Sequence, residues 1–118
     1  MVDYSKLSDF EINKRVALII APELNDKECY DISGRAVFHD KKGTCGFSFI
    51  SDPADAWPII AEKRISIMFD STMPEYEGEY HEWCDAMSTC QKFGIQHQSN
   101  PLRAAMIVFL MMQDAKNG

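Results

Sequence analysis

Asn100-Pro101-Leu102-Arg103, followed by nine unbroken apolar residues from Ala104 to Met112, is the stretch of sequence that decides the fold. An asparagine side chain caps a helix by accepting a backbone N–H, and proline suits the first helical position, where no N–H is needed. We therefore predict a helix over 101–114. Because this helix is apolar all round, nearly every side of it must be covered. The cover comes either from the rest of the chain or from a second subunit, and we expect a two-fold dimer through this helix.

A second helix begins in the same way, at Asp52-Pro53. Asp52 is the expected cap, and the helix is predicted over 53–63. Pro58 falls near its middle, where the missing backbone N–H favours a kink. The residues expected on its buried face are Trp57, Ile60 and Ala61.

The first helix begins with a capping box, Ser8-Asp9-Phe10-Glu11. Ser8 is expected to accept the backbone N–H of Glu11, while the Glu11 carboxylate reaches back to the N–H of Ser8. Leu7 and Ile12 on either side of the cap complete a hydrophobic staple. Apolar residues at helical spacing continue until shortly before the next proline, so this helix is predicted over 9–19.

The remaining apolar segments alternate weakly and are predicted as short strands. Arg35–His39 and Gly46–Ile50 form a hairpin, whereas the polar stretch Pro22–Gly34 before them is predicted as a loop. The alternative for this region is a long irregular excursion with little pairing. The order α-(ββ)-α-β-β-β-α predicts an α+β fold in which a small antiparallel sheet packs against two or three helices. The three later strands are expected at Ile65–Phe69, Tyr80–Met87 and Lys92–His97.

Length and composition are those of an ordinary globular domain. The 118 residues, 46% hydrophobic and 25% charged, suit a single domain over 1–118. The formal net charge of −6 argues against binding to a nucleic-acid backbone, which attracts Lys and Arg. No basic-then-apolar leader opens the sequence, so the four cysteines are expected to be reduced thiols in the cytoplasm. The longest apolar run is about half a membrane span, so no membrane anchor is expected.

Candidate metal ligands occur in the pattern H-x2-C-x5-C-x6-H, formed by His81, Cys84, Cys90 and His97. Zinc ligands usually come in tight pairs, and only His81 and Cys84 have that spacing. We therefore favour two small buried cysteines and two surface histidines. An acidic cluster offers a cation site, a solvated loop or a negative rim for a basic partner, and we prefer the loop. Its members are Asp70, Glu75, Glu77, Glu79 and Glu82.

Catalytic signatures are missing from the sequence. It has no glycine-rich phosphate loop, no serine elbow and no local signature around a cysteine, so we favour a non-enzymatic protein without a cofactor. The two tryptophans offer stacking surfaces, although large aromatic residues are more often core. Arg103 opposes the dipole of its own helix, so it is either a surface ion pair or a cation held near a groove by acidic neighbours such as Asp52 or Asp55. The candidate binding set is Trp57, Trp83, Arg103, Asp52 and Asp55.

Three blocks of sequence, spread from end to end of the chain, carry a family resemblance. They are LSDFEINKRVA at Leu7–Ala17, DPADAWPII at Asp52–Ile60 and NPLRAAM at Asn100–Met106. In these blocks the chain resembles the NinX-type proteins of lambdoid bacteriophages. The resemblance implies a phage gene product that acts in the cytoplasm of the infected bacterial host, and it carries over no catalytic residue.

These features predict a phage-encoded, non-enzymatic accessory protein that binds and modulates a host or phage protein, in counter-defence or host takeover. The alternative is a protein that binds or sequesters a small nucleotide-type ligand. In that case Trp57 and Trp83 stack on the ligand, and Arg103 pairs with a phosphate. A weaker alternative is a metal-dependent hydrolase or nuclease that uses the acidic cluster.

Overall fold

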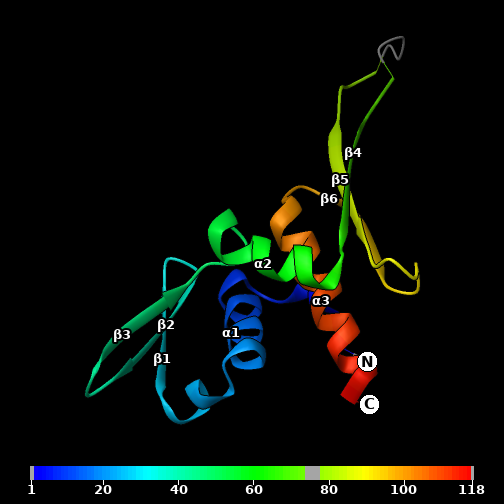
Figure 1. Cartoon of the computed structure of the whole chain (residues 1–118). Helices are drawn as coiled ribbons and strands as arrows, with labels where there is room; N and C mark the ends of the chain where they lie inside the picture. The colour runs from blue at the N-terminus through cyan, green and yellow to red at the C-terminus, as the bar shows by residue number, and fades with distance from the viewer. Residues whose placement is uncertain (1, 74–77, 118) are drawn as a thin grey trace.

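Helix α3 (Pro101–Asn117) lies at the centre of the structure, a computed structural model that describes residues 2–73 and 78–117 (Figure 1). The predicted cap is confirmed, because Asn100 Oδ1 accepts two backbone N–H groups of the first turn at 3.0 and 3.1 Å. The Asn100 amide also donates to the carbonyl oxygen of Ile50 at 2.8 Å. The start of the helix is thereby fixed to a distant part of the chain.

The apolar part of α3 is buried within its own chain. The seven residues from Ala104 to Leu110 are each at most 2% exposed. The apolar residues of α3 are therefore covered by the rest of the same chain. The two-fold dimer through 101–114 stays a prediction, but the need to cover this helix no longer argues for it. The elements that contact α3 include α1 (Asp9–Ile20), α2 (Pro53–Lys63), β4 (Ser66–Ser71), β5 (Glu82–Met87) and β6 (Gly94–Gln98).

The strands form two antiparallel sheets of three strands each, rather than one small sheet. The first has the order β1-β2-β3 and the second the order β4-β5-β6. The α+β class is confirmed, and the predicted order of elements fits approximately. The remaining elements are η1 (Tyr4–Lys6), η2 (Pro22–Asp26), β1 (Glu28–Ile32), β2 (Arg35–Asp40) and β3 (Gly43–Phe47).

Strand β1 occupies a region that was predicted as a loop, so the prediction for Pro22–Gly34 is wrong. It pairs with β2 over its whole length. Most of its side chains are exposed on this edge strand, so no alternating apolar face marks it in the sequence. Ser33 and Gly34, with φ of 53° and 86°, form the tight turn that joins the two strands.

The second hairpin strand, predicted over Gly46–Ile50, is displaced toward the N-terminus as β3. Asp40 Oδ1 accepts the backbone N–H groups of Lys42 and Gly43 at 2.8 and 3.1 Å, which closes a tight turn. The end of the predicted strand, Phe49–Ile50, therefore lies beyond β3 and is buried in the core.

Helix α2 has its predicted bounds, and the Asp52 carboxylate accepts the N–H of Ala54 at 3.0 Å. The predicted buried face is wrong, because Trp57 is 64% exposed and Ala61 is also exposed. Helix α2 packs against α3. With the small side chain of Ala56 on the buried side, the two helices can approach more closely than the indole of Trp57 would allow. The buried residues of α2 are Ala56, Ile59 and Ile60.

Helix α1 holds the first sheet through one fully buried polar side chain, Asn13. Its amide donates to the carbonyl oxygen of Gly34, and its carbonyl oxygen accepts the N–H of Phe49, both at 2.8 Å. Phe38 of β2 is buried beside it in the core and meets Phe47 edge to face, with ring centroids 6.2 Å apart. The first sheet is thus one wall of the core.

The chain before α1 is tied to the C-terminal end of α3. The Tyr4 hydroxyl donates to the Asp114 carboxylate. Burial, together with this carboxylate, raises the pKa of Tyr4 to about 12, so the phenol stays a neutral donor. Ser8 caps α1 as predicted by accepting the N–H of Glu11 at 3.2 Å, whereas the Glu11 carboxylate pairs with Arg15 at 3.6 Å.

The two sheets lie on opposite sides of the helices and make the molecule long (Figure 1). Its radius of gyration is 15.8 Å, and its extents are 58 × 31 × 25 Å. A compact chain of this length has a radius of gyration of about 13.5 Å. Strands β4 and β5 project beyond the helices, and we call residues 66–73 and 78–87 the arm. None of the helices, as far as the chain is described, is long and apolar enough to span a membrane.

Candidate functional site

The negative charge of the chain is concentrated on the arm. Between Ser66 and Met87 the sequence has six acidic residues and no Lys or Arg, so this segment carries the same formal charge, −6, as the whole chain. The other acidic and basic residues, twelve of each, balance. The arm therefore attracts positively charged groups. Four of the six acids, Asp70, Glu79, Glu82 and Asp85, lie on the arm, and the other two, Glu75 and Glu77, lie outside the described residues.

Large apolar side chains are exposed on the same arm. Phe69 and Met73 are each 74% exposed, and Tyr80 is 62% exposed. Phe69 lies on the edge strand opposite Cys84, and its ring is in solvent although the Cys84 side chain is buried. Aromatic residues and methionine are enriched where proteins bind one another, so this exposure makes the arm a candidate interaction surface.

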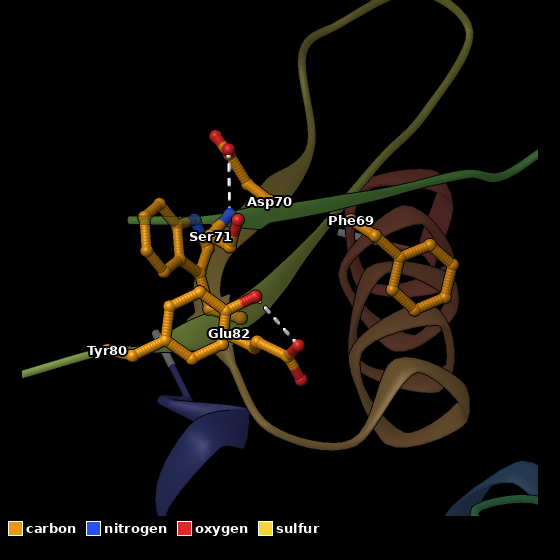
Figure 2. Close-up of a pocket in the computed structure, with 6 residues that line it drawn as sticks. Phe69, Asp70, Ser71, Tyr80 and Glu82 are labelled. Atoms are coloured by element: carbon orange, nitrogen blue, oxygen red, sulfur yellow. Dashed lines mark hydrogen bonds between the residues drawn. The ribbon is translucent and has the colours of Figure 1, made fainter. Parts of the chain in front are cut away.

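An open cavity of about 370 Å³ lies on the arm. The Tyr80 hydroxyl donates to Glu82 at 3.0 Å, and the Ser71 N–H donates to Asp70 at 2.8 Å (Figure 2). Both carboxylates are therefore held in place, while the Phe69 ring points away from them. An ammonium or guanidinium group here meets carboxylates and aromatic rings, the combination that binds Lys and Arg. The lining residues are Phe69, Asp70, Ser71, Tyr80, Glu82 and Trp83.

Trp83 is held in one orientation on the arm. Its ring stacks on His97 of β6, with centroids 5.0 Å apart and planes 28° apart. His97 has a φ of 55° where the pairing of β5 with β6 shifts register, and Asp85 Oδ1 accepts its N–H at 2.9 Å. A positive φ outside glycine persists only where the surroundings enforce it. The bulge thus positions the histidine that supports the tryptophan.

Of the predicted binding set, only Trp83 lines this cavity. Arg103 instead holds the N-terminal segment. Its Nη1 lies 2.7 Å from Asp9 Oδ1, and its Nη2 donates to the carbonyl oxygens of Ser5 and Leu7 at 3.1 and 2.7 Å. The acidic partner of Arg103 is therefore Asp9, and neither Asp52 nor Asp55 fills the expected role.

The other three members of the predicted set belong to α2. Asp52 caps the helix, and Asp55 Oδ2 accepts the N–H of Ser48 at 3.0 Å, which closes the loop before it. Trp57 is exposed on the same helix. Both carboxylates therefore have a structural role, and the tryptophan stays a candidate contact for a partner.

The two cysteines of the predicted metal pattern are in different surroundings. Cys84 is buried as expected, donates to the carbonyl oxygen of Gln98 at 3.2 Å, and has its thiol pKa raised by burial. Cys90 is exposed, contrary to expectation. A hydrogen bond with the Ser88 hydroxyl, at 3.3 Å, is the main cause that lowers the pKa of its thiol.

The two histidines of the pattern also have separate partners. His81 Nε2 lies 3.8 Å from a carboxylate oxygen of Glu79, whereas His97 stacks on Trp83. Within residues 2–73 and 78–117, no three His, Cys, Asp or Glu side chains gather as metal ligands.

Sequence reasoning missed Phe69 and Tyr80 as site residues, because both were read as members of ordinary strands. The signal that marks them was present in the charge distribution. A stretch of 22 residues without Lys or Arg, next to exposed aromatic residues, separates this hairpin from the rest of a charge-balanced chain.

Comparison with curated proteins and with solved structures gave no match. A family model described as "Bacteriophage P22, NinX" matches residues 3–113, nearly the whole chain. This agrees with the resemblance in the three sequence blocks. The chain therefore belongs to the NinX family of bacteriophage proteins.

Proposed function

We propose that this phage accessory protein binds and modulates another protein of the infected cell without catalysing a reaction, and that the arm is its binding surface. The observation that carries the proposal is that four acidic side chains, no Lys or Arg, and two exposed aromatic side chains occur together on the described residues of one projecting hairpin. Charge steers a partner and aromatic anchors hold it, so the two features together favour a binding role.

The surface selects a basic partner. The Asp70 and Glu82 carboxylates beside Tyr80 and Trp83 suit Lys or Arg side chains, which gain ion pairs and ring contacts together. A nucleic-acid backbone is repelled by the same charge. The function thus requires a protein partner with an exposed positive surface, in the cytoplasm of the host bacterium.

The test compares capture of partners from host lysate by three tagged forms of the protein. The arm variant is Asp70→Asn with Glu82→Gln, which keeps shape and hydrogen-bonding oxygens. The control is Asp26→Asn with Glu62→Gln, which changes the charge equally at exposed sites away from the arm. We expect the wild type and the control to retain a stoichiometric partner that the arm variant loses. An empty capture by the wild type, or equal capture by both variants, would overturn the proposal.

Small-ligand binding is a second candidate function, favoured by a second cavity of about 400 Å³. This volume suits a small ligand, and Lys92 offers a cation to a phosphate. A nucleotide at 100 times its dissociation constant should stabilise the protein by about 2.7 kcal/mol. Lys92→Ala should abolish the thermal shift and Lys116→Ala should not, and no shift with any nucleotide rejects this candidate. The lining residues are Val2, Tyr4, Lys92, Phe93, Gly94, Met111, Asp114 and Ala115.

A further inference from the structure

We infer that the basic partner contributes an extended segment that pairs as an added strand with the free edge of β4. This inference rests on the proposed function and specifies how the arm binds. The order of the second sheet ends at β4, so among the described residues one side of this strand has no neighbouring strand. An edge of this kind offers main-chain donors and acceptors to an incoming strand.

The register identifies which backbone groups are free. The N–H of Thr72 donates to the carbonyl oxygen of His81 at 2.9 Å. Groups that face the partner strand alternate along an antiparallel pair, so those of Ile67, Phe69 and Ser71 point to the open side. The Ser71 N–H agrees with this assignment, because it is bonded to its neighbour Asp70 and not to β5. Ile67 and Phe69 therefore present the free donors and acceptors of the edge.

Asp70 is the one charged side chain that protects the edge of β4, and the strand lacks the other usual devices, proline, lysine and a bulge. Its sequence, SIMFDS, contains no proline, lysine or glycine, and its pairing with β5 runs without a bulge from Ser66 to Ser71. The opposite edge of the same sheet is different, because β6 carries the bulge with the positive φ at His97. Of the two edges of this sheet, β4 is the one suited to accept a strand.

The two faces of the arm specify the side chains of the incoming segment. On one face, Asp70 lies beside Trp83, and Asp85 lies opposite Met68. On the other face, Ile67 and Phe69 line the edge, and Glu82 lies opposite Ser71 at the end of the strand. Since side chains of a strand alternate between faces, the fitting segment alternates Lys or Arg with apolar residues. The charge also disfavours a second copy of this chain, because two arms that each carry four carboxylates and no Lys or Arg would be brought together.

The probe is an eight-residue peptide of alternating lysine and valine, measured by isothermal titration or fluorescence anisotropy at fixed salt. Two derivatives are methylated at the backbone nitrogens of either the lysines or the valines. Charge and side chains are the same in both, but successive N–H groups of a strand point to opposite edges. One derivative therefore loses the donors that face β4, and the other loses only donors on its outer side. We expect the first to bind at least about tenfold more weakly, equal to about 1.4 kcal/mol, and the second to bind like the parent.

The matched protein variants are Phe69→Pro and Phe69→Val. Both remove the exposed ring, but only proline removes an N–H that points to the free edge, and it leaves the pairing with β5 intact. We expect Phe69→Pro to bind the parent peptide at least about tenfold more weakly than Phe69→Val. Circular dichroism and thermal melting of both variants verify that they are folded.

The outcomes separate this inference from the proposed function. Equal binding of both methylated peptides, or no binding of the parent peptide, overturns strand pairing even when a lysate partner depends on the arm carboxylates. A wild-type dimer in sedimentation that Phe69→Pro disrupts also overturns it, in favour of pairing between two copies. Peptide binding that discriminates between the methylated forms supports it even when no lysate partner is recovered.

Discussion

The sheets β1-β2-β3 and β4-β5-β6 have the same number of strands and the same antiparallel order, but they differ in charge and in the exposure of their aromatic side chains. Residues 28–47 contain three acidic and three basic side chains, whereas residues 66–98 contain six acidic side chains and one lysine. The central strand of the first sheet buries Phe38, while the edge strand of the second exposes Phe69. Both sheets contribute to the core, since Cys84 and Ala86 of β5 are buried, but only the second also presents exposed aromatic side chains and an excess of acids. Topology alone therefore does not distinguish their roles.

The largest expected effect tests this difference with one substitution in each sheet. Phe38→Ala should lower the free energy of unfolding by about 3–5 kcal/mol, because it leaves a cavity in the core. Phe69→Ala should change it by less than about 0.5 kcal/mol, because the ring is already in solvent. Urea denaturation followed by circular dichroism measures both. Similar losses for the two variants would show that the second sheet is also part of the core.

The helix starts could be predicted from the sequence because their physics is local. Ser8, Asp52 and Asn100 each accept an N–H two or three residues ahead, and no distant partner is needed. Strand β1 and the orientation of Trp57 could not be predicted in this way. Pairing of an exposed edge strand and the choice of a helix face both depend on neighbours that only the fold supplies.

The candidate site was predictable in composition but not in geometry. The acidic cluster and Trp83 were identified from residue types, and a basic partner was one of the alternatives. The partner of Arg103 was not predictable, because Asp9 is 94 residues away in the chain. The projection of β4 and β5 past the helices, which exposes Phe69, is likewise a property of packing.

The next largest loss of stability is expected for Asn13, which connects α1 to the first sheet. Asn13→Ala should cost about 2–4 kcal/mol, because it leaves the buried backbone groups of Gly34 and Phe49 without partners. Asn25→Ala, at an exposed asparagine, is the control and should have little effect. Hydrogen exchange should accelerate in β1–β3 and not in β4–β6. Equal acceleration in both sheets would mean that they unfold as one unit and would weaken the comparison.

A smaller loss of stability is expected for Arg103, which was predicted to form either a surface ion pair or part of a ligand site. Arg103→Met should lower the free energy of unfolding by about 1–3 kcal/mol, since it removes a charge-assisted pair with Asp9 and two bonds to backbone carbonyls. Arg103→Lys should rescue it only in part, because an ammonium lacks the planar fork. Denaturation and limited proteolysis of the N-terminal segment measure this. Capture of a partner by the arm should persist, and its loss would return Arg103 to the binding site.

The smallest expected effect is on the melting temperature when carboxylates are neutralised. The change should have opposite signs in the two sheets. In the first sheet Asp40 pairs with Lys27 at 2.5 Å, and this contact and two backbone N–H groups hold the pKa of Asp40 below its ordinary value. Asp40→Asn should therefore lower the melting temperature slightly at neutral pH. A lowered carboxyl pKa stabilises the fold above the ordinary value of about 4, and the stabilisation is lost as pH falls through the lowered value. The melting temperatures of the wild type and of Asp40→Asn should therefore converge in acid.

In the second sheet, Asp70→Asn with Glu82→Gln removes like charges from a segment that has no Lys or Arg, so it should leave the melting temperature unchanged or raise it slightly. The gain should shrink in high salt, where repulsion is screened. Differential scanning fluorimetry at several pH values and salt concentrations measures the change in melting temperature for both variants. A clear loss of stability in the arm variant would mean that these carboxylates hold the fold together, and the second sheet would then no longer differ from the first.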